Sequence, residues 1–447
     1  MEADNMLLIG NGRVVTRNPA APVLENGCVA VQDHKIVAVA ATAELRNQYP
    51  GAEWLDAGDR LIMPGLINAH MHCYSSFARG MDIKAQSPQQ FQEILERLWW
   101  RLDKTLTLED VYYSAAVAMI DCIRNGVTTI FDHHASPHCA PGSLFRMEEA
   151  ADALGIRTCL CYEVSDRDGE EIARQGIAEN RDYILHCRPE RNGLRRALFG
   201  LHASFTLNDV LLRRCADTAA ELAVGCHIHT AEALSDVEDC QRRFGKRVVE
   251  RLQSFGLLNS ATITAHCVQV DEREIGILRD ETPFVVHNPE SNMGNAVGCA
   301  PVLEMARQGV RVGLGTDGYT CDMLESLKVA NLLHKHQQQS PAVAWAEPHE
   351  MLFGRNAEFA SACFGETLGQ LTPGAMADII VVDYEPPTPL NADNLNGHVL
   401  FGLTGRTVTT TVIHGKVVMR DRQILTADER EIFARARELA EKLWRRF

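Results

Sequence analysis

The chain has 447 residues, of which 46% are hydrophobic and 23% are charged, and its formal net charge is −15. This composition allows a large core, and an acidic balance without a basic run excludes nucleic acid as an expected partner, because phosphate backbones attract Lys and Arg surfaces. The sequence also lacks a signal-peptide pattern and any run of roughly 18 apolar residues, so we expect a cytoplasmic protein without a membrane partner.

The first 61 residues contain short strand-like runs separated by turn residues, such as LLIGNGRVV and AEWLDAG. Residues 62–368 differ, because strand-like and helical segments alternate there. Barrel strands are expected at 62–72, 127–134, 157–164, 196–205, 224–232, 261–270, 283–291 and 311–318. Eight such units predict an α/β fold of the (β/α)8 TIM barrel type, whose active site lies at the carboxyl ends of the strands.

Residues 369–447 return to short strands in DIIVVDY, VTTTVIHGKVV and RQILT. A helix is expected to close the chain over 427–446, where apolar residues recur at helical spacing. Because both ends have the same texture, we predict one small β-sandwich domain built from residues 1–61 and residues 369–447, with the terminal helix attached to the second part.

Candidate metal ligands lie at the downstream ends of the expected strands: His70 and His72 in LIMPGLINAHMH, His229 in AVGCHIHTAE, and Asp317 in VRVGLGTDG. Side chains two residues apart on a strand share one face, so His70 and His72 can bind one ion from the same side. Imidazoles together with a carboxylate leave an open position for water. We therefore predict one divalent metal ion, with zinc favoured and iron or manganese left open.

Three residues are expected to carry the chemistry. Asp317 can bind the metal and also accept a proton from its water. Glu232, three residues beyond His229, is predicted to be a proton shuttle, because a group that protonates a ring nitrogen and then a departing amine must change its own protonation state. His266 in ATITAHCVQV either binds the ion or polarises the substrate, and we favour the second role because the other ligands and a water complete the coordination sphere.

Further polar side chains at the strand ends are predicted to line a substrate pocket, although each could instead serve local structure. These are Arg79, His133, His134, His202, His287 and Asn288. Such a concentration of hydrogen-bonding groups suits a flat, polar nitrogen heterocycle better than a long apolar or polyanionic substrate. For Arg79, surface charge is the alternative interpretation.

The ordered motifs MPGLINAHMH, HTAE, AHC, HNPESNM, LGTDG and GQLTPGAMADIIVVD resemble the amidohydrolase superfamily, in particular its cytosine-deaminase-like aminohydrolases. HMHCYSSFARG, LWWRLDKTL and DHHASP make the chain most similar to the SsnA-type aminohydrolases associated with purine catabolism. The resemblance implies the same four metal ligands, Glu232 as the shuttle, His266 beside the water, substrate contacts at His202 and Arg79, and a homodimer.

The chain departs from the family pattern at two places. Gly294 and Asn295 stand where many relatives have Lys and Leu, and Ser204 replaces a usual proline. These departures concern the substrate rather than the chemistry.

Our leading hypothesis is hydrolytic deamination of a purine-, pterin- or pyrimidine-like ring with release of ammonia. The alternative is ring opening of a cyclic amide or amidine, such as an imidazolone, in purine breakdown. The mass of the product separates the two, because deamination adds about one dalton and hydration adds about eighteen. A catalytically inactive scaffold is a third hypothesis, which the complete ligand set disfavours.

Overall fold

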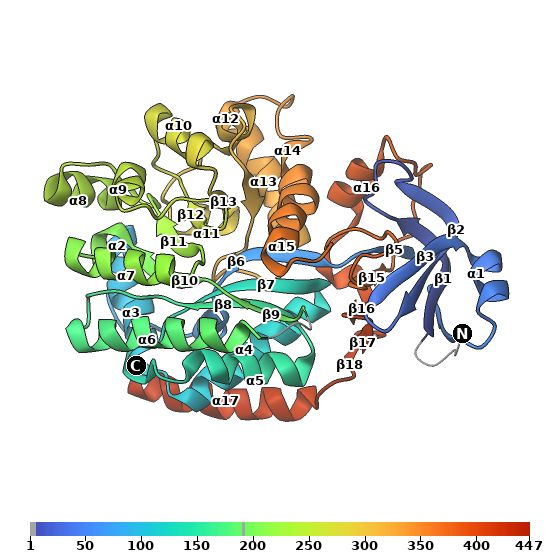
Figure 1. Cartoon of the computed structure of the whole chain (residues 1–447), viewed down its shortest axis with the longest axis horizontal. Coiled ribbons are helices and arrows are strands. Elements are labelled where there is room, and N and C mark those ends of the chain that lie inside the picture. Colours follow the sequence, from blue (N-terminus) through green and yellow to red (C-terminus); the bar gives the residue numbers. More distant parts are fainter. Residues whose placement is uncertain (1–5, 190–192) are drawn as a thin grey trace.

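The computed structural model describes residues 6–189 and 193–447. Figure 1 shows two units side by side: a barrel wrapped in helices, and a β-sheet unit that contains segments from both ends of the chain. Among the described helices, none combines the length and the apolar composition needed to cross a bilayer.

The sheet unit joins nine strands from the two ends of the chain, in the order β18-β17-β16-β15-β5-β1-β2-β3, with β4 beside β1. The strands are β1 Met6–Val15, β2 Val23–Gln32, β3 Lys35–Ala41, β4 Glu53–Asp56, β5 Leu61–Pro64, β15 Ile379–Val382, β16 Val408–Ile413, β17 Lys416–Arg420 and β18 Gln423–Ile424. The antiparallel pairing of β5 with β15 unites the two ends.

Side chains alternate across this terminal sheet as strand geometry requires. Leu7 and Ile9 of β1 pack into one core, whereas Leu8 packs with Leu45 into another. Leu45 belongs to α1, a short helix over Thr42–Gln48. Strands from both chain ends lie in one connected sheet of nine strands, and the assignment of this unit as a β-sandwich stays a prediction.

Eight parallel strands form the barrel in the described part of the chain, each within or overlapping its predicted range. They are β6 Leu66–Met71, β7 Val127–His134, β8 Arg157–Tyr162, β10 Phe199–Ala203, β11 Cys226–Thr230, β12 Ile263–His266, β13 Phe284–His287 and β14 Val312–Leu314. A further short strand, β9 (Arg195–Ala197), pairs in parallel with β8 and directly precedes β10 in the chain.

Helices fill the connections and the outer layer. They are α2 Phe91–Ile94, α3 Trp100–Thr105, α4 Leu108–Arg124, α5 Ser143–Leu154, α6 Glu170–Cys187, α7 Asp209–Glu221, α8 Leu234–Phe244, α9 Val248–Ser254, α10 Glu272–Glu281, α11 Pro289–Gly294, α12 Val302–Arg307, α13 Met323–Gln338, α14 Glu347–His349, α15 Asn356–Phe364, α16 Leu395–Gly402 and α17 Glu429–Arg446.

The strand expected over 62–72 is two strands, which corrects the first domain boundary. The change occurs at Gly65, whose backbone N–H bonds the carbonyl of Asp378 in the terminal sheet unit. The next residue, Leu66, bonds the carbonyl of Gly126 in the barrel instead. The chain therefore changes sheets at Gly65, and the barrel begins at β6 rather than at residue 62.

The barrel has a seam between β8 and β10, where the two strands share only the isolated bridge Val164–Leu201. A buried side chain from α6, Asn180, completes the pairing. Its Oδ1 accepts from the N–H groups of Tyr162 and Gly200 at 2.8 and 3.2 Å, and its Nδ2 donates to both carbonyls at 2.7 and 3.3 Å. The amide thus replaces backbone hydrogen bonds that a regular ladder would supply.

The second seam lies between β6 and β14, joined by the bridge Met71–Asp317. Here the buried amide comes from Asn356, the first residue of α15. Its Nδ2 donates to the carbonyls of Ile67 and Leu314, both at 2.8 Å, and its Oδ1 accepts from the N–H of Leu314 at 2.9 Å. Both seams are therefore closed by the same kind of side chain.

The terminal helix α17 lies against α4 on the outside of the barrel, as Figure 1 shows, rather than against the terminal sheet. Its buried apolar stripe is Ile432, Ala436, Leu439 and Leu443, as the helical spacing predicts. The helix predicted over 427–446 is correct to within two residues, but its packing ties the last segment of the chain to the barrel.

Candidate metal centre and active site

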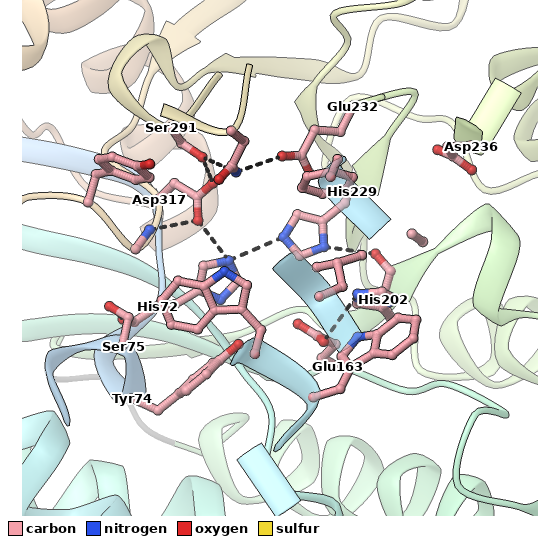
Figure 2. Close-up of a pocket in the computed structure, with 18 of the residues that line it drawn as sticks. His72, Tyr74, Ser75, Glu163, His202, His229, Glu232, Asp236, Ser291 and Asp317 are labelled. Atoms are coloured by element: carbon pink, nitrogen blue, oxygen red, sulfur yellow. Dashed lines mark hydrogen bonds and ion pairs between the residues drawn. The ribbon is translucent and has the colours of Figure 1, made fainter. Parts of the chain in front are cut away.

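The four predicted metal ligands meet at the carboxyl ends of the barrel strands, and Figure 2 shows His72, His229 and Asp317 of this set. His70 lies in β6 and His72 directly follows it, His229 lies in β11, and Asp317 follows β14. His72 Nε2 is 3.2 Å from His229 Nε2 and 3.1 Å from Asp317 Oδ1, while His70 Nε2 is 4.0 Å from the same carboxylate oxygen. The four predicted ligands therefore lie close together, and their role as metal ligands stays a prediction.

The donor set fits a divalent cation. The Nε2 atoms of His70 and His266 are buried and have no hydrogen-bond partner among the residues that the structure describes. Ligand atoms of His70, His229 and His266 lie within 4.8 Å of one another, and so do those of His70, His72 and Asp317. Unpartnered imidazole nitrogens beside a carboxylate are the chemistry of a zinc-type centre, since a buried polar atom without a partner is otherwise costly.

Each imidazole is oriented by a contact at its other nitrogen. His72 Nδ1 lies 2.6 Å from the carbonyl of His133, and His229 Nδ1 lies 3.0 Å from the carbonyl of His202. These contacts fix the tautomer and turn both Nε2 atoms toward the centre.

His70 is oriented by a residue that we did not predict. Its Nδ1 lies 2.8 Å from Nε2 of His227, which is fully buried. His227 and His229 form a second His-x-His pair, the same pattern that identified His70 and His72. That pattern was the available signal in the sequence.

The Asp317 carboxylate is held rigidly. Its backbone has φ of 54°, and the N–H of Gly318 donates to Oδ1 at 2.6 Å. The hydroxyl of Ser291 donates to Oδ2 at 2.6 Å. Although burial opposes ionisation, the neighbouring His72 ring and the Ser291 hydroxyl hold the pKa of Asp317 well below its ordinary value, so the carboxylate is charged.

Glu232 lies across the centre from His72, just beyond the end of β11. Its Oε2 is 3.6 Å from His266 Nε2, and its Oε1 accepts from Asn295 Nδ2 at 3.4 Å. Burial raises the pKa of Glu232 to about 7. A carboxyl group with such a pKa can both hold and release a proton near neutral pH, which matches the shuttle role expected for it.

His266 occupies the position between Glu232 and Asp317. Its Nε2 is 3.5 Å from Asp317 Oδ2, and its Nδ1 is 2.9 Å from Asn292 Oδ1. The ring therefore borders the metal-ligand cluster while its other nitrogen is fixed. Both roles that the sequence left open for His266, ligand and polarising group, agree with this position.

A cavity opens above this cluster. Its lining includes His72, Tyr74, Phe91, Trp99, Trp100, Glu163, His202, Phe205, His229, Glu232, Asp236, Ser291, Asn295, Asp317 and Tyr319. The walls combine aromatic rings with many polar and charged groups, which suits a small polar ligand. Glu163 and Asp236 in this wall were not predicted, although Glu163 lies near the carboxyl end of the strand expected over 157–164.

Of the residues expected to line the pocket, His202 does so. His133 is fully buried behind the cavity wall. Its Nε2 is 3.0 Å from the carbonyl of His227, and its Nδ1 is 3.3 Å from Glu163 Oε2. His133 therefore contacts Glu163, which lines the cavity, but does not line the cavity itself.

His134 and Arg79 need correction as pocket-lining residues. Strand alternation turns His134 away from the cavity, and its Nε2 contacts the Ser136 hydroxyl at 2.9 Å. The Arg79 side chain is 63% exposed and pairs with Asp121 at 3.0 Å, beside a neighbouring groove. Surface charge, the alternative stated for Arg79, describes it better.

His287 and Asn288 also lie outside the cavity lining. Val286 takes the inward position in β13 and packs in the barrel core, so His287 points toward α13, where it lies 3.2 Å from His334. The Asn288 side chain lies 3.5 Å from His266 Nδ1 and supports that ring from behind. The expectation of direct substrate contact is therefore not met in this arrangement.

Comparison with known proteins agrees with the geometry. The amidohydrolase family model matches residues 61–418. The chain belongs to the amidohydrolase family. A second match, to an imidazolonepropionase-like composite domain of bacteria, covers residues 27–52 of this amidohydrolase, within its terminal sheet unit and away from the cavity.

Full-length relatives include named deaminases. The 5-methylthioadenosine/S-adenosylhomocysteine deaminase of Syntrophomonas wolfei is 32% identical over 446 residues, covering 98% of this chain and 99% of the relative. The 5'-deoxyadenosine deaminase of Methanosarcina mazei is 30% identical over 444 residues and 98% of each chain.

Solved structures share the whole fold of this amidohydrolase. An adenosine deaminase from Xanthomonas campestris with bound zinc has a TM-score of 0.87 at 26% identity, covering 98% of each chain. A guanine deaminase from C. acetobutylicum with bound guanine has a TM-score of 0.77 at 18% identity, covering 92% of this chain and 100% of that chain, and shows likeness of fold alone.

Proposed function

We propose that this amidohydrolase deaminates a purine-like nitrogen heterocycle by hydrolysis. The observation that carries the proposal is the placement of Glu232, with a pKa of about 7, at 3.6 Å from His266 and across from the charged Asp317. The deaminase names of the full-length relatives support the same reaction class.

The metal ligands and Glu232 have separate roles in the proposed reaction. A divalent ion held by His70, His72, His229 and Asp317 would lower the pKa of a bound water from about 15.7 to near 7. Asp317 accepts a proton from the attacking water. Protonated Glu232 delivers its proton to the ring nitrogen beside the amine-bearing carbon. It then takes the hydroxyl proton of the tetrahedral centre and passes it to the amine, which leaves as ammonia while the carbonyl forms. The proton held by Asp317 restores Glu232 to its starting state.

The test is ammonia release from a panel of aminated purines, pterins and pyrimidines by metal-replete protein, with the product mass recorded. We expect ammonia together with a product about one dalton heavier than its substrate. A product about eighteen daltons heavier, without ammonia, would instead establish ring opening. Absence of any product from the whole panel would contradict the proposal.

Three finer expectations stay proposals. Zinc is the proposed ion, supported by the imidazole-rich donor set and by zinc in a structural relative. A place in purine breakdown follows from the proposed substrate class. A homodimer follows from the family resemblance, and sedimentation of the purified protein tests it. Retention of all four ligands in one cluster argues against an inactive scaffold.

A further inference from the structure

A buried carboxylate that the mechanism above does not use lies in the cavity wall. Glu163 directly follows β8, and its side chain is 4% exposed. Figure 2 shows it on the other side of His72 and His229 from Glu232. The two glutamates therefore flank the place where a substrate ring would sit over the metal ligands.

Glu163 and His202 together present hydrogen-bond acceptors to the cavity, where a ligand could supply the donor. His202 Nδ1 is 2.6 Å from the Thr206 hydroxyl, which itself donates to the carbonyl of Ala203 at 3.2 Å. With the hydroxyl hydrogen directed to Ala203, the Thr206 oxygen accepts from His202 Nδ1–H, and Nε2 of the neutral ring carries the lone pair. That Nε2 lies 3.7 Å from Glu163 Oε1, which places two acceptors side by side at the cavity.

The other carboxylate oxygen, Glu163 Oε2, has no hydrogen-bond partner in the described chain and is 3.3 Å from His133 Nδ1. His133 is itself fixed at Nε2 by the His227 carbonyl. This arrangement holds Oε2 in place and leaves Oε1 beside His202 Nε2 at the cavity.

A second metal ion is a poorer occupant of this position. Ligand atoms of His72, His133, Glu163 and His229 do lie within 4.8 Å of one another. However, His72 and His229 each have Nδ1 engaged by a backbone carbonyl, so each has one nitrogen left, and the first centre uses it. His133 and Glu163 alone provide too few donors for a structural or catalytic metal site.

We propose that Glu163 and His202 bind an N–H group of the substrate, on the side of the attacked carbon opposite the ring nitrogen that Glu232 protonates. This inference rests on the proposed deamination and narrows its substrate class. The amine-bearing carbon of the substrate lies between two ring nitrogens, one of which carries hydrogen, as in guanine and pterin. Adenine and cytosine place a carbon atom there and offer no donor, so this chain differs in preference from the adenosine-type relatives.

The test compares kcat/KM for ammonia release from guanine, 1-methylguanine and 5'-deoxyadenosine. We expect the wild-type protein to prefer guanine over 1-methylguanine by about 100-fold or more, because the methyl group removes the N–H and leaves buried acceptors unpaired. Glu163→Gln is expected to lower kcat/KM for guanine by about 100-fold and to erase most of that preference. Equal or faster wild-type turnover of 5'-deoxyadenosine would overturn the proposal.

Two further measurements show whether the effect of Glu163→Gln comes from a lost substrate contact, from lost metal or from loss of any buried carboxylate. Glu163→Gln should retain the wild-type metal content, and loss of metal would overturn the proposal by making Glu163 a ligand. Glu148→Gln is the matched control, since this buried carboxylate contacts His186 on the outside of the barrel at 2.9 Å. It should leave the guanine preference unchanged.

If no probe yields ammonia, the proposed deamination fails, whereas the inference about Glu163 is still open to a binding test. Equilibrium dialysis of guanine and 1-methylguanine with metal-replete protein then decides the present inference. Tighter guanine binding that Glu163→Gln abolishes supports it. Equal binding of the two probes, or a preference that survives the substitution, overturns it.

Discussion

The two carboxylates proposed to be catalytic owe their different ionisation to their immediate neighbours. Asp317 accepts hydrogen bonds from Ser291 and Gly318 and lies beside His72, so it stays charged despite burial. Glu232 accepts one long contact from Asn295, and burial prevails, which raises its pKa to about 7. Such a pair, with pKa values pushed apart, assigns one carboxylate to charge and the other to proton transfer.

Glu232→Gln tests that assignment. The substitution keeps the shape of the side chain, but an amide cannot act as an acid or a base near neutral pH. We therefore expect kcat for deamination to fall by about 10²- to 10⁴-fold. Bound metal, measured by atomic emission, should stay at the wild-type ratio. His229→Asn is the contrasting variant, expected to lose both metal and activity, and metal loss in Glu232→Gln would contradict the separation of roles.

At this scale the sequence located the metal ligands but not every pocket residue. The two-residue strand period and the strand ends sufficed for His70 and His72. For His287 they did not, because the outcome depends on which residue of β13 faces inward, and Val286 takes that place. Contacts made in space, such as that between Glu163 and His202, leave no local pattern in the sequence.

At the level of elements, the barrel depends on side-chain amides at its two seams. Asn180 and Asn356 are buried and each makes several bonds to strand backbones. The eight strands were predictable from apolar runs bounded by turns, and all were found. The seams were not, because a polar residue within a helical pattern ordinarily indicates an exposed face.

Asn356→Ala tests the seam between β6 and β14. It leaves the carbonyls of Ile67 and Leu314 and the Leu314 N–H without their side-chain partner, so we expect the free energy of unfolding to fall by about 2–4 kcal/mol. Chemical denaturation measures the change. The exposed Asn391→Ala serves as a control for loss of an amide, and an equal effect in both variants would contradict the argument.

A second test at this scale concerns pH. Glu290 of α11 accepts from the Ser326 hydroxyl of α13 at 2.9 Å, and burial raises its pKa from 4.5 to about 7. Between those two pH values the folded protein keeps a proton that the unfolded chain releases, so the contribution of this group to stability falls as pH rises from about 4.5 to about 7.

Glu290→Gln should remove that pH dependence. We expect the variant to match the wild type near pH 4 and to exceed it by about 1–3 kcal/mol in free energy of unfolding near pH 8.5. Denaturation curves at the two pH values provide the measurement. A constant difference between the variant and the wild type at both values would show that Glu290 titrates normally.

At the scale of the whole molecule, the two units share a buried ion pair. Arg157 of β8 and Asp378, which precedes β15, are both almost completely buried and directly paired. Asp378 also accepts from the His414 N–H at 2.8 Å, and Arg157 Nε donates to the Gly193 carbonyl at 2.7 Å. Local sequence patterns predicted both units, but they could not predict an ion pair between residues so far apart in the chain.

Asp378→Ala is expected to lower the free energy of unfolding by about 3–5 kcal/mol, because it leaves the Arg157 charge buried without its partner. The double variant Arg157→Leu with Asp378→Ala should be more stable than Asp378→Ala alone. Glu366→Gln removes the partly exposed pair with Lys35 and should cost about 1 kcal/mol or less. A similar cost for both pairs would contradict the role of burial.

The change of sheets at Gly65 has a practical meaning for protein engineering. Upstream of this glycine the backbone is clamped by the outer unit, and downstream, within a few residues, it carries the first two imidazoles of the metal centre. Excising the barrel as a separate fragment would release the leading end of that strand. Affinity for the cation should therefore suffer in such a fragment even with every ligand still present.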